Sequence, residues 1–301
     1  MKFLQNIPPY LFFTGKGGVG KTSISCATAI RLAEQGKCVL LVSTDPASNV
    51  GQVFNQAIGN TVQPVAAVPG LSALEIDPQD AAQQYRARIV APIKGLLPDD
   101  VVNSINEQLS GACTTEIAAF DEFTGLLTDA SLLTRFDHII FDTAPTGHTI
   151  RLLQLPGAWS RFIESNPDGA SCLGPMAGLE KQREQYAHAV EALSDPQRTR
   201  LVLVARLQKS TLQEVVRTHE ELAAIGLKNQ HLVINGVLPA AEAEHDVLAA
   251  AIWQREQEAL ATLPAGLSAL PTDTLFLQPL NMVGVPALKS LLNEVAVSAS
   301  L

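Results

Sequence analysis

The segment GKGGVGKT, from Gly15 to Thr22, has the residue types and the spacing of a phosphate-binding loop. It matches the pattern G-x-x-x-x-G-K-[ST], with an apolar run before it and a helical run after it, so a merely glycine-rich turn is the weaker interpretation. Glycines let backbone N–H groups turn toward phosphate oxygens, and the amino end of the following helix adds positive potential. We therefore expect a nucleotide site in which Lys21 reaches the β- and γ-phosphates and the Thr22 hydroxyl binds Mg²⁺. The residues expected to bind the nucleotide here are Gly15, Lys16, Gly17, Gly18, Val19, Gly20, Lys21, Thr22 and Ser23.

Two acidic residues end apolar runs and are candidates for the same site. Asp45 ends the run 38–45, and Asp142 lies near the end of the run 137–143. Strand-end acids lie beside the phosphates in parallel sheets, so we favour Asp45 as a catalytic residue and both acids as supports for Mg²⁺. The alternatives are a turn that Asp45 begins with Pro46 and a helix cap or loop position for Asp142. The spacing leaves open which acid orients the attacking water.

The elements that must position these residues predict the fold. Apolar runs typical of strands alternate with helical stretches, and the helix 23–36 ends at Gly36. This alternation predicts an α/β fold, a three-layer P-loop NTPase with a mostly parallel central sheet and helices on both faces. The expected strands are 10–15, 38–45, 137–143, 200–205, 231–236 and 274–279.

Two long stretches between the strands are interpreted as helical insertions. They lie at about 46–136 and 151–197 and carry apolar residues at helical spacing. We expect them to form a helical subdomain on the carboxyl edge of the sheet, within a single domain that spans 1–301.

The composition limits the class of protein. Apolar residues make up 47% of the chain and charged residues 17%, as in globular proteins. The net charge of −9 argues against a nucleic-acid partner, because phosphate backbones require clustered lysine and arginine. No apolar run approaches the roughly 20 residues of a spanning helix, and Pro8 and Pro9 interrupt the first one, so we expect a cytoplasmic protein. The four cysteines include no C-x-x-C pair, which argues against a disulfide framework.

Several segments carry a resemblance to a known family. KGGVGKT with its additional lysine, STDPASN and DTAPTGHTIRLLQLP together resemble the deviant Walker-A ATPases. The last segment is similar in particular to the arsenite-transporting ATPases and to their relatives that target tail-anchored membrane proteins. LSGACTTEIAAFDEF and NPDGASCLGPMAGLEKQ resemble metalloid-binding segments in the amino-terminal half of the bacterial arsenite-pump ATPases, and the resemblance extends over the whole chain.

The resemblance implies roles for the residues around the phosphates. Lys16 corresponds to the signature lysine of these ATPases, which reaches across an interface to the nucleotide held by the other ATPase half and acts in catalysis with Lys21. Asp45 lies in the first switch, near magnesium and the attacking water. The segment 142–149 resembles the second switch, which links the γ-phosphate to the metalloid site through His148.

The resemblance also implies contacts to the base of ATP. Asn235, at the end of HLVIN, corresponds to a residue that contacts adenine. Pro271, Thr272 and Asp273, in the LPTDTL segment, are expected to form a loop that closes over the base.

Two cysteines and a histidine make up the implied metalloid site. As(III) and Sb(III) are soft and thiophilic, so thiolates are natural ligands for them. From the residues alone, packing as a small buried hydrophobe is the more common outcome for Cys113 and Cys172. The resemblance reverses that preference and adds His148, with the metalloid as an allosteric ligand, whereas Cys26 and Cys38 are expected to be structural. The third metalloid cysteine of the family belongs to its second ATPase half, and this sequence contains one phosphate loop.

The function that the resemblance implies is an ATPase that couples ATP hydrolysis to export of arsenite or antimonite through a membrane carrier. The implied partners are a second ATPase half, in the same longer chain or in a homodimer, the carrier, which holds the ATPase at the inner membrane, and an arsenite metallochaperone. The alternative is a chaperone that targets tail-anchored proteins, but its methionine-rich groove and C-x-x-C clasp are not matched by three methionines and no such pair. A partitioning ATPase of cell division is a third reading, but residues 291–301 are neither basic nor strongly amphipathic.

Overall fold

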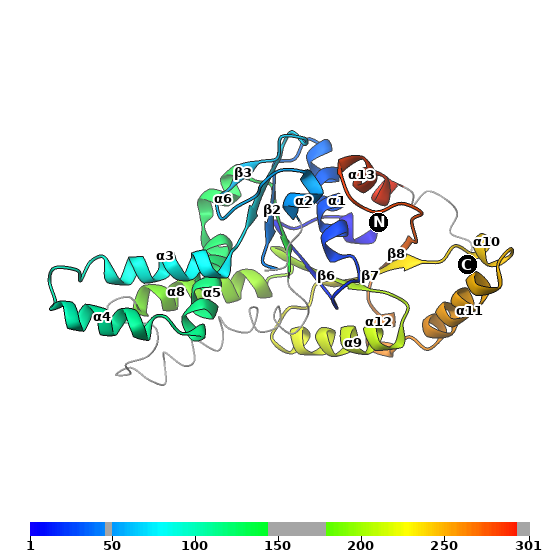
Figure 1. Cartoon of the computed structure of the whole chain (residues 1–301). Coiled ribbons are helices and arrows are strands. Elements are labelled where there is room, and N and C mark those ends of the chain that lie inside the picture. Colours follow the sequence, from blue (N-terminus) through cyan, green and yellow to red (C-terminus); the bar gives the residue numbers. More distant parts are fainter. Residues whose placement is uncertain (46–49, 144–178, 294–301) are drawn as a thin grey trace.

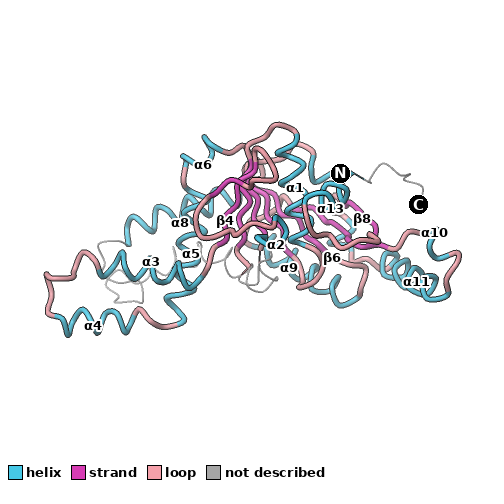
Figure 2. Tube along the Cα trace, turned by 45° about the horizontal axis from the view of Figure 1, so that its top comes forward, coloured by secondary structure: helices cyan, strands magenta, loops and turns pink. Residues whose placement is uncertain are grey.

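The computed structural model describes residues 1–45, 50–143 and 179–293, which form an α/β structure around one eight-stranded sheet (Figures 1 and 2). The strand order is β3-β4-β2-β5-β1-β6-β7-β8, and the strands pair in parallel except for β3, which runs antiparallel to β4 at one edge. The strands are β1 Tyr10–Thr14, β2 Val39–Ser43, β3 Gln63–Pro64, β4 Leu71–Glu75, β5 His138–Asp142, β6 Thr199–Ala205, β7 Gln230–Val237 and β8 Thr272–Phe276.

Helices cover both faces of the sheet, which confirms the expected three layers. Helices α1, α2 and α13 pack on one face, and α5, α6, α8, α9 and α12 pack on the other (Figure 1). The helices are η1 Lys2–Leu4, α1 Lys21–Glu34, α2 Val50–Phe54, α3 Pro78–Val90, α4 Asp99–Gln108, α5 Ala112–Thr128, α6 Ala130–Arg135, α8 Leu179–Ser194, α9 Lys209–Ala224, α10 Ala240–Ala243, α11 Val247–Ala261, α12 Ala265–Ser268 and α13 Val285–Asn293.

The alternation of side chains along each strand explains why both faces are apolar. In β1, Leu11 and Phe13 join the core on the α1 side, while Tyr10 and Phe12 join the core on the α5 side. Phe12 stacks on Phe141 of the neighbouring β5, with ring centroids 4.4 Å apart. Strands buried in this way are continuous apolar runs, and all six strands expected from the sequence are present.

The expectation that the stretch 46–136 is largely helical is wrong in one part, because β3 and β4 lie within it. β4 extends the sheet beside β2, with Leu71 paired to Val39 and Glu75 paired to Ser43. Its sequence, LSALE, consists largely of residues that favour helices, so local propensity predicts the wrong element. Pairing with β2 decides the conformation of this segment.

The helices α3, α4, α5 and α8 extend away from the sheet as a helical arm (Figure 1). A separate apolar cluster holds the arm together, in which Tyr85 of α3 packs with Ile117 of α5. Phe120 of α5 and Tyr186 of α8, with ring centroids 4.8 Å apart, anchor the base of the arm in the sheet core. Of the second insertion expected at 151–197, the described part is α8 with the turn that follows it. Among the described helices, none is both long enough and apolar enough to cross a membrane.

Candidate functional site

The glycine-rich loop connects the carboxyl end of β1 to the first turn of α1, in the middle of the sheet. Gly20 is the N-cap residue, with φ of +97°, and its carbonyl oxygen accepts a 3.1 Å hydrogen bond from the N–H of Ile24. The first turn of α1 contains no acidic residue, and no side chain of the described residues caps the amino end of this helix. The N–H groups of this turn therefore form the arrangement that binds a phosphate.

Two glycines are required because the loop packs tightly against the neighbouring strands. A Cβ atom at Gly15 would lie 2.2 Å from the carbonyl oxygen of Val204 in β6, and one at Gly20 would lie 2.3 Å from Nδ2 of Asn235 in β7. Between them, Val19 buries its side chain in the core on the α1 side. The backbone of the loop is thus fixed from both sides, which fixes the position of a phosphate bound by its N–H groups.

Lys21 is almost completely buried beside the loop. Its Nζ donates a 3.3 Å hydrogen bond to the carbonyl oxygen of Lys16. Burial lowers the pKa of the Lys21 ammonium group, and three nearby carboxylates act in the opposite direction, those of Asp142, Asp45 and Glu214. These acids therefore surround the lysine that is expected to meet the phosphates.

Asp142 carries a carboxylate that is completely buried at the end of β5. Neither oxygen meets a hydrogen-bond donor in good geometry among the described residues. Burial raises the pKa of Asp142 to about 6, although the Thr22 hydroxyl and the Lys21 ammonium group are near enough to lower it. Most buried polar groups are satisfied by hydrogen bonds, so this carboxylate indicates a missing partner. A divalent cation fits, because it prefers oxygen ligands and Thr22 supplies a hydroxyl beside the acid.

Further polar groups gather at the same edge of the sheet. The hydroxyls of Thr14, at the end of β1, and Thr44, after β2, are buried and have no hydrogen-bond partner within the described part of the chain. Asp45 follows Thr44, is half-buried, and its charge contributes to the raised pKa of Asp142. The carboxyl ends of β2, β5 and β1 are neighbours in the sheet, so they bring Asp45 and Asp142 together beside Lys21, as their strand-end positions predict.

The described residues contain no group of three or more histidine, cysteine, aspartate or glutamate side chains placed to hold a metal ion. A cation at Asp142 therefore needs further oxygen ligands. A magnesium ion usually obtains these from substrate phosphates and water, which agrees with a site beside a phosphate loop.

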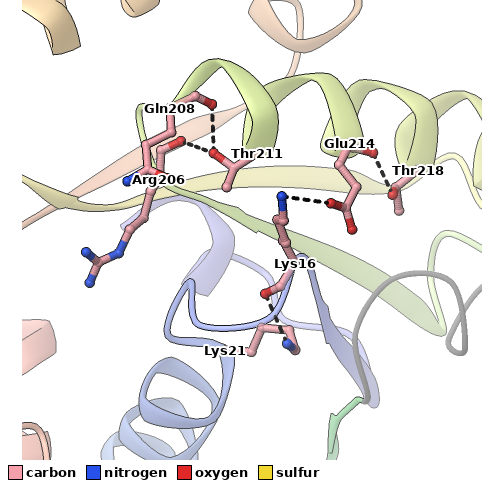
Figure 3. A network of polar contacts seen from close by, with 7 residues as sticks. All are labelled: Lys16, Lys21, Arg206, Gln208, Thr211, Glu214 and Thr218. Atoms are coloured by element: carbon pink, nitrogen blue, oxygen red, sulfur yellow. Dashed lines mark hydrogen bonds and ion pairs between the residues drawn. The ribbon is translucent and has the colours of Figure 1, made fainter.

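Lys16 projects from the loop toward α9 (Figure 3). Its Nζ lies 3.7 Å from Oε2 of Glu214, and the two side chains are 42% and 33% exposed. This separation is longer than a hydrogen bond, so the two residues form a loose ion pair.

Asn235 lies near the carboxyl end of β7 and contacts the loop directly. Its side-chain amide donates a 2.7 Å hydrogen bond to the carbonyl oxygen of Val19. The structure thus brings Asn235 to the phosphate loop, although the two are 216 residues apart.

The expectation for Pro271, Thr272 and Asp273 is contradicted by the structure. Thr272 and Asp273 begin β8 and lie at the amino edge of the sheet, opposite the phosphate loop. The buried carboxylate of Asp273 accepts hydrogen bonds from the N–H groups of Lys2 (2.8 Å) and Phe3 (2.9 Å). The expectation came from the family resemblance, which does not fix where a parallel strand begins; here the strand starts at Thr272 and places these residues at its amino end. The segment that reaches the nucleotide edge is the one after β8.

Two charged residues at this edge were not found from the sequence. Arg206 directly follows β6, its guanidinium group lies against Gly236, and its buried Nε has no hydrogen-bond partner among the described residues. Its place after an apolar strand is a signal that identifies it in retrospect. Glu214 lies within α9, where nothing in the local sequence marks it; only the packing of α9 beside the loop brings it to Lys16.

Of the three expected metalloid ligands, only Cys113 falls within the described elements, in the first turn of α5. His148 and Cys172 lie outside the described residues. Cys26 is buried in α1, where burial raises the pKa of its thiol, as expected for a structural cysteine. Cys38 is exposed just before β2, so the expectation that it packs as a hydrophobe is wrong.

The amino-acid sequence is also similar to sequences of known proteins. The model of the anion-transporting ATPase family matches residues 9–296. An arsenical pump-driving ATPase of Acidiphilium multivorum is 91% identical over 292 residues, which are 97% of this chain and 50% of that protein. One of Escherichia coli is 89% identical over 301 residues, 100% of this chain and 52% of that protein. The ATPase get3 of Aspergillus terreus is 32% identical over 254 residues, 76% of this chain and 73% of that protein.

The chain thus spans about half the length of the arsenical pump-driving ATPases that it matches. The family match includes every strand of the sheet and the whole phosphate loop. This chain belongs to the family of anion-transporting ATPases.

Proposed function

We propose that this chain is an ATPase half that binds ATP with Mg²⁺ and couples its hydrolysis to export of arsenite or antimonite through a membrane carrier. The observation that carries the proposal is the buried carboxylate of Asp142, which lies beside Lys21 and Thr22 at the amino end of α1 and has no hydrogen-bond partner among the described residues. The identities of 91% and 89% to arsenical pump-driving ATPases support the class of exported ion.

The residues of the site have separate proposed roles in binding the phosphates, holding magnesium and orienting water. The loop N–H groups, including that of Ser23, and the Lys21 ammonium group bind the phosphates. Magnesium, held by Thr22, Asp45 and Asp142, supplies positive charge against the phosphate oxygens when it is bound. The complete burial of Asp142 favours it as the cation support, and the partial exposure of Asp45 favours it as the residue that orients water. The difference in burial thus supports one division of the two roles that strand-end position leaves open.

Asn235 is the proposed contact to adenine. It lies at the carboxyl end of β7, directly beside the loop. One N–H of its amide is engaged with Val19, and the amide group has a second N–H and an oxygen that a base can use.

A second ATPase half is the proposed partner. The signature lysine, Lys16, is part-exposed and only loosely paired, which leaves it able to cross an interface. The chain also spans only half of the arsenical relatives, which supports a second half in a longer chain, or a second copy. The membrane carrier and an arsenite metallochaperone are further proposed partners.

Cys113, His148 and Cys172 are the proposed ligands of As(III) or Sb(III), with the thiolates as soft donors. A mechanical connection to the phosphate site supports this assignment. Cys113 lies in the first turn of α5, and Phe123 of the same helix packs edge-on against Phe141, the residue before Asp142, with ring centroids 5.5 Å apart. A shift of α5 on metalloid binding is therefore transmitted to β5 and its carboxylate.

The test is ATP turnover in the presence of antimonite or arsenite. We expect the metalloid to raise turnover, and Cys113→Ser combined with Cys172→Ser to remove this stimulation while ATP binding persists. Cys38→Ser, at an exposed cysteine, is the matched control and keeps the stimulation. A double variant that is stimulated like the parent chain would contradict the metalloid assignment.

A further inference from the structure

The ion pair between Lys16 and Glu214 joins the phosphate loop to α9, a helix that the nucleotide chemistry does not otherwise use (Figure 3). Its geometry is set by the helix. Thr211, in the first turn of α9, is buried and donates hydrogen bonds to the carbonyl oxygens of Arg206 (2.7 Å) and Gln208 (2.8 Å). These bonds tie the start of α9 to the end of β6 and fix its rotation.

The next turn of α9 packs its core-facing side chains into the protein interior. Val215 and Thr218 are buried there, and the Thr218 hydroxyl donates a 2.8 Å hydrogen bond within the helix to the carbonyl oxygen of Glu214. With these neighbours in place, the Glu214 side chain is presented to the loop (Figure 3). The glutamate end of the pair is therefore positioned by the fold, whereas Lys16 sits on a flexible stem of four methylene groups.

The Lys16–Glu214 ion pair is weak enough to break and form again. At 3.7 Å, with both side chains partly exposed, the pair contributes little to the stability of the fold. A nucleotide phosphate carries more charge than one carboxylate and accepts stronger charge-assisted hydrogen bonds, so it competes effectively for the lysine. The carboxylate of Glu214 also raises the pKa of Lys21 slightly against the effect of burial, so its charge is felt at the second lysine of the loop.

We propose that Glu214 is a positioning residue that holds Lys16 against α9, away from the phosphates, until a nucleotide in the second ATPase half competes for the lysine. The proposal rests on the proposed function, because it concerns the lysine that is to cross between halves. It adds a restraint within this half: closure against a second half has to break the Lys16–Glu214 pair. Until the two halves close, the pair keeps Lys16 away from the phosphates, and it therefore opposes ATP hydrolysis by a separate half.

The test is a double-mutant cycle read out as the Kd for Mg–ATP, measured on the 301-residue chain with a fluorescent ATP analogue. Glu214→Gln releases Lys16, which then turns back to the phosphates of its own loop, so we expect Mg–ATP binding to tighten about two- to fivefold. In a chain that already carries Lys16→Ala, Glu214→Gln has no lysine to release. The gain is then expected to disappear.

The matched control is Glu221→Gln, two turns further along the same helix, where the carboxylate pairs with Arg217 at 2.6 Å instead of with Lys16. It removes the same charge from α9 and leaves the Kd unchanged. Unfolding midpoints of all variants confirm that they are folded. If Glu214→Gln does not fold, Glu214→Asp keeps the charge, shortens the side chain, and is expected to tighten binding to a smaller extent.

An equal gain with lysine or alanine at position 16 means that Glu214 only repels the phosphates, and it overturns the inference. No gain in either background overturns it as well. Failure of the unsubstituted chain to bind Mg–ATP would instead contradict the proposed function itself. The two failures are therefore distinguishable.

Discussion

The side-chain amide of Asn235 donates a 2.7 Å hydrogen bond to the carbonyl oxygen of Val19, and so fastens the end of β7 to the phosphate loop. The same amide fills the space that a side chain at Gly20 would occupy, since a Cβ there would lie 2.3 Å from its nitrogen. The conformation of the loop thus depends both on its own glycines and on Asn235, a residue that is distant in the sequence. Asn235 thus connects the geometry of the loop to the proposed contact with the base.

Replacement of Asn235 by alanine tests this connection. The variant loses the bond to Val19, which costs about 1 kcal/mol of unfolding free energy, and it leaves the loop less well placed for phosphates. We expect the Kd for Mg–ATP to rise about five- to tenfold. Asn103→Ala, at an exposed position of α4, is the control for both measurements. An unchanged Kd in the Asn235 variant would show that the bond is only structural.

The buried carboxylate of Asp142 predicts a pH-dependent stability in the absence of nucleotide and magnesium. Its pKa is about 6 in the folded chain and near 3.8 for an ordinary aspartate, so folding favours the protonated form. The stability from this group is fully present below about pH 4 and is lost as the pH rises through 6, a difference of about 3 kcal/mol.

Asp142→Asn removes this titration. We expect the variant to equal the parent chain near pH 4, to exceed it by up to about 3 kcal/mol at pH 7.5, and to lose tight Mg–ATP binding. Urea unfolding at the two pH values measures the first effect. An asparagine variant that is less stable than the parent chain at pH 7.5 would show that the carboxylate is already satisfied.

Lys16→Ala separates binding from turnover. The lysine stands apart from the loop interior and pairs loosely with Glu214, so its loss leaves the N–H groups and Lys21 in place. We expect the Kd for Mg–ATP to change less than fivefold and turnover in the protein with both ATPase halves to be abolished. Lys37→Ala, at a lysine that pairs with Asp137 before β5, is the control. Normal turnover in the Lys16 variant would make this lysine a surface charge.

Asp273→Ala tests the corrected position of the segment before β8. The carboxylate accepts two backbone hydrogen bonds at the amino edge of the sheet, and their loss is expected to cost about 2–4 kcal/mol of unfolding free energy. The Kd for Mg–ATP is expected to stay within about twofold, because the nucleotide edge lies at the other end of the strands. Thr274→Ala, at an exposed position of the same strand, is the control for stability. If Asp273→Ala bound Mg–ATP much more weakly and kept its unfolding free energy, the segment 271–273 would contact the base after all.

The sequence by itself determined the phosphate loop, six of the eight strands and the place of both acids. Each depends on short-range pattern: GKGGVGKT needs particular backbone angles at its glycines, and strands buried on two faces must be continuous apolar runs. Asp45 and Asp142 could be assigned to the nucleotide edge because the carboxyl ends of parallel strands meet there.

Only the tertiary structure decided which distant groups meet. The helix-favouring segment LSALE becomes β4 because β2 offers a partner edge. Asp273 bonds to the N-terminal turn, and Glu214 reaches Lys16 only because α9, tied at its start to the end of β6 through Thr211, packs beside the loop. The Asp273 and Glu214 contacts join residues about 200 to 270 positions apart. The hydrophobic periodicity of a sequence depends only on residues that are close along the chain. The register of strands and the packing of such distant segments are decided only when the whole sheet assembles.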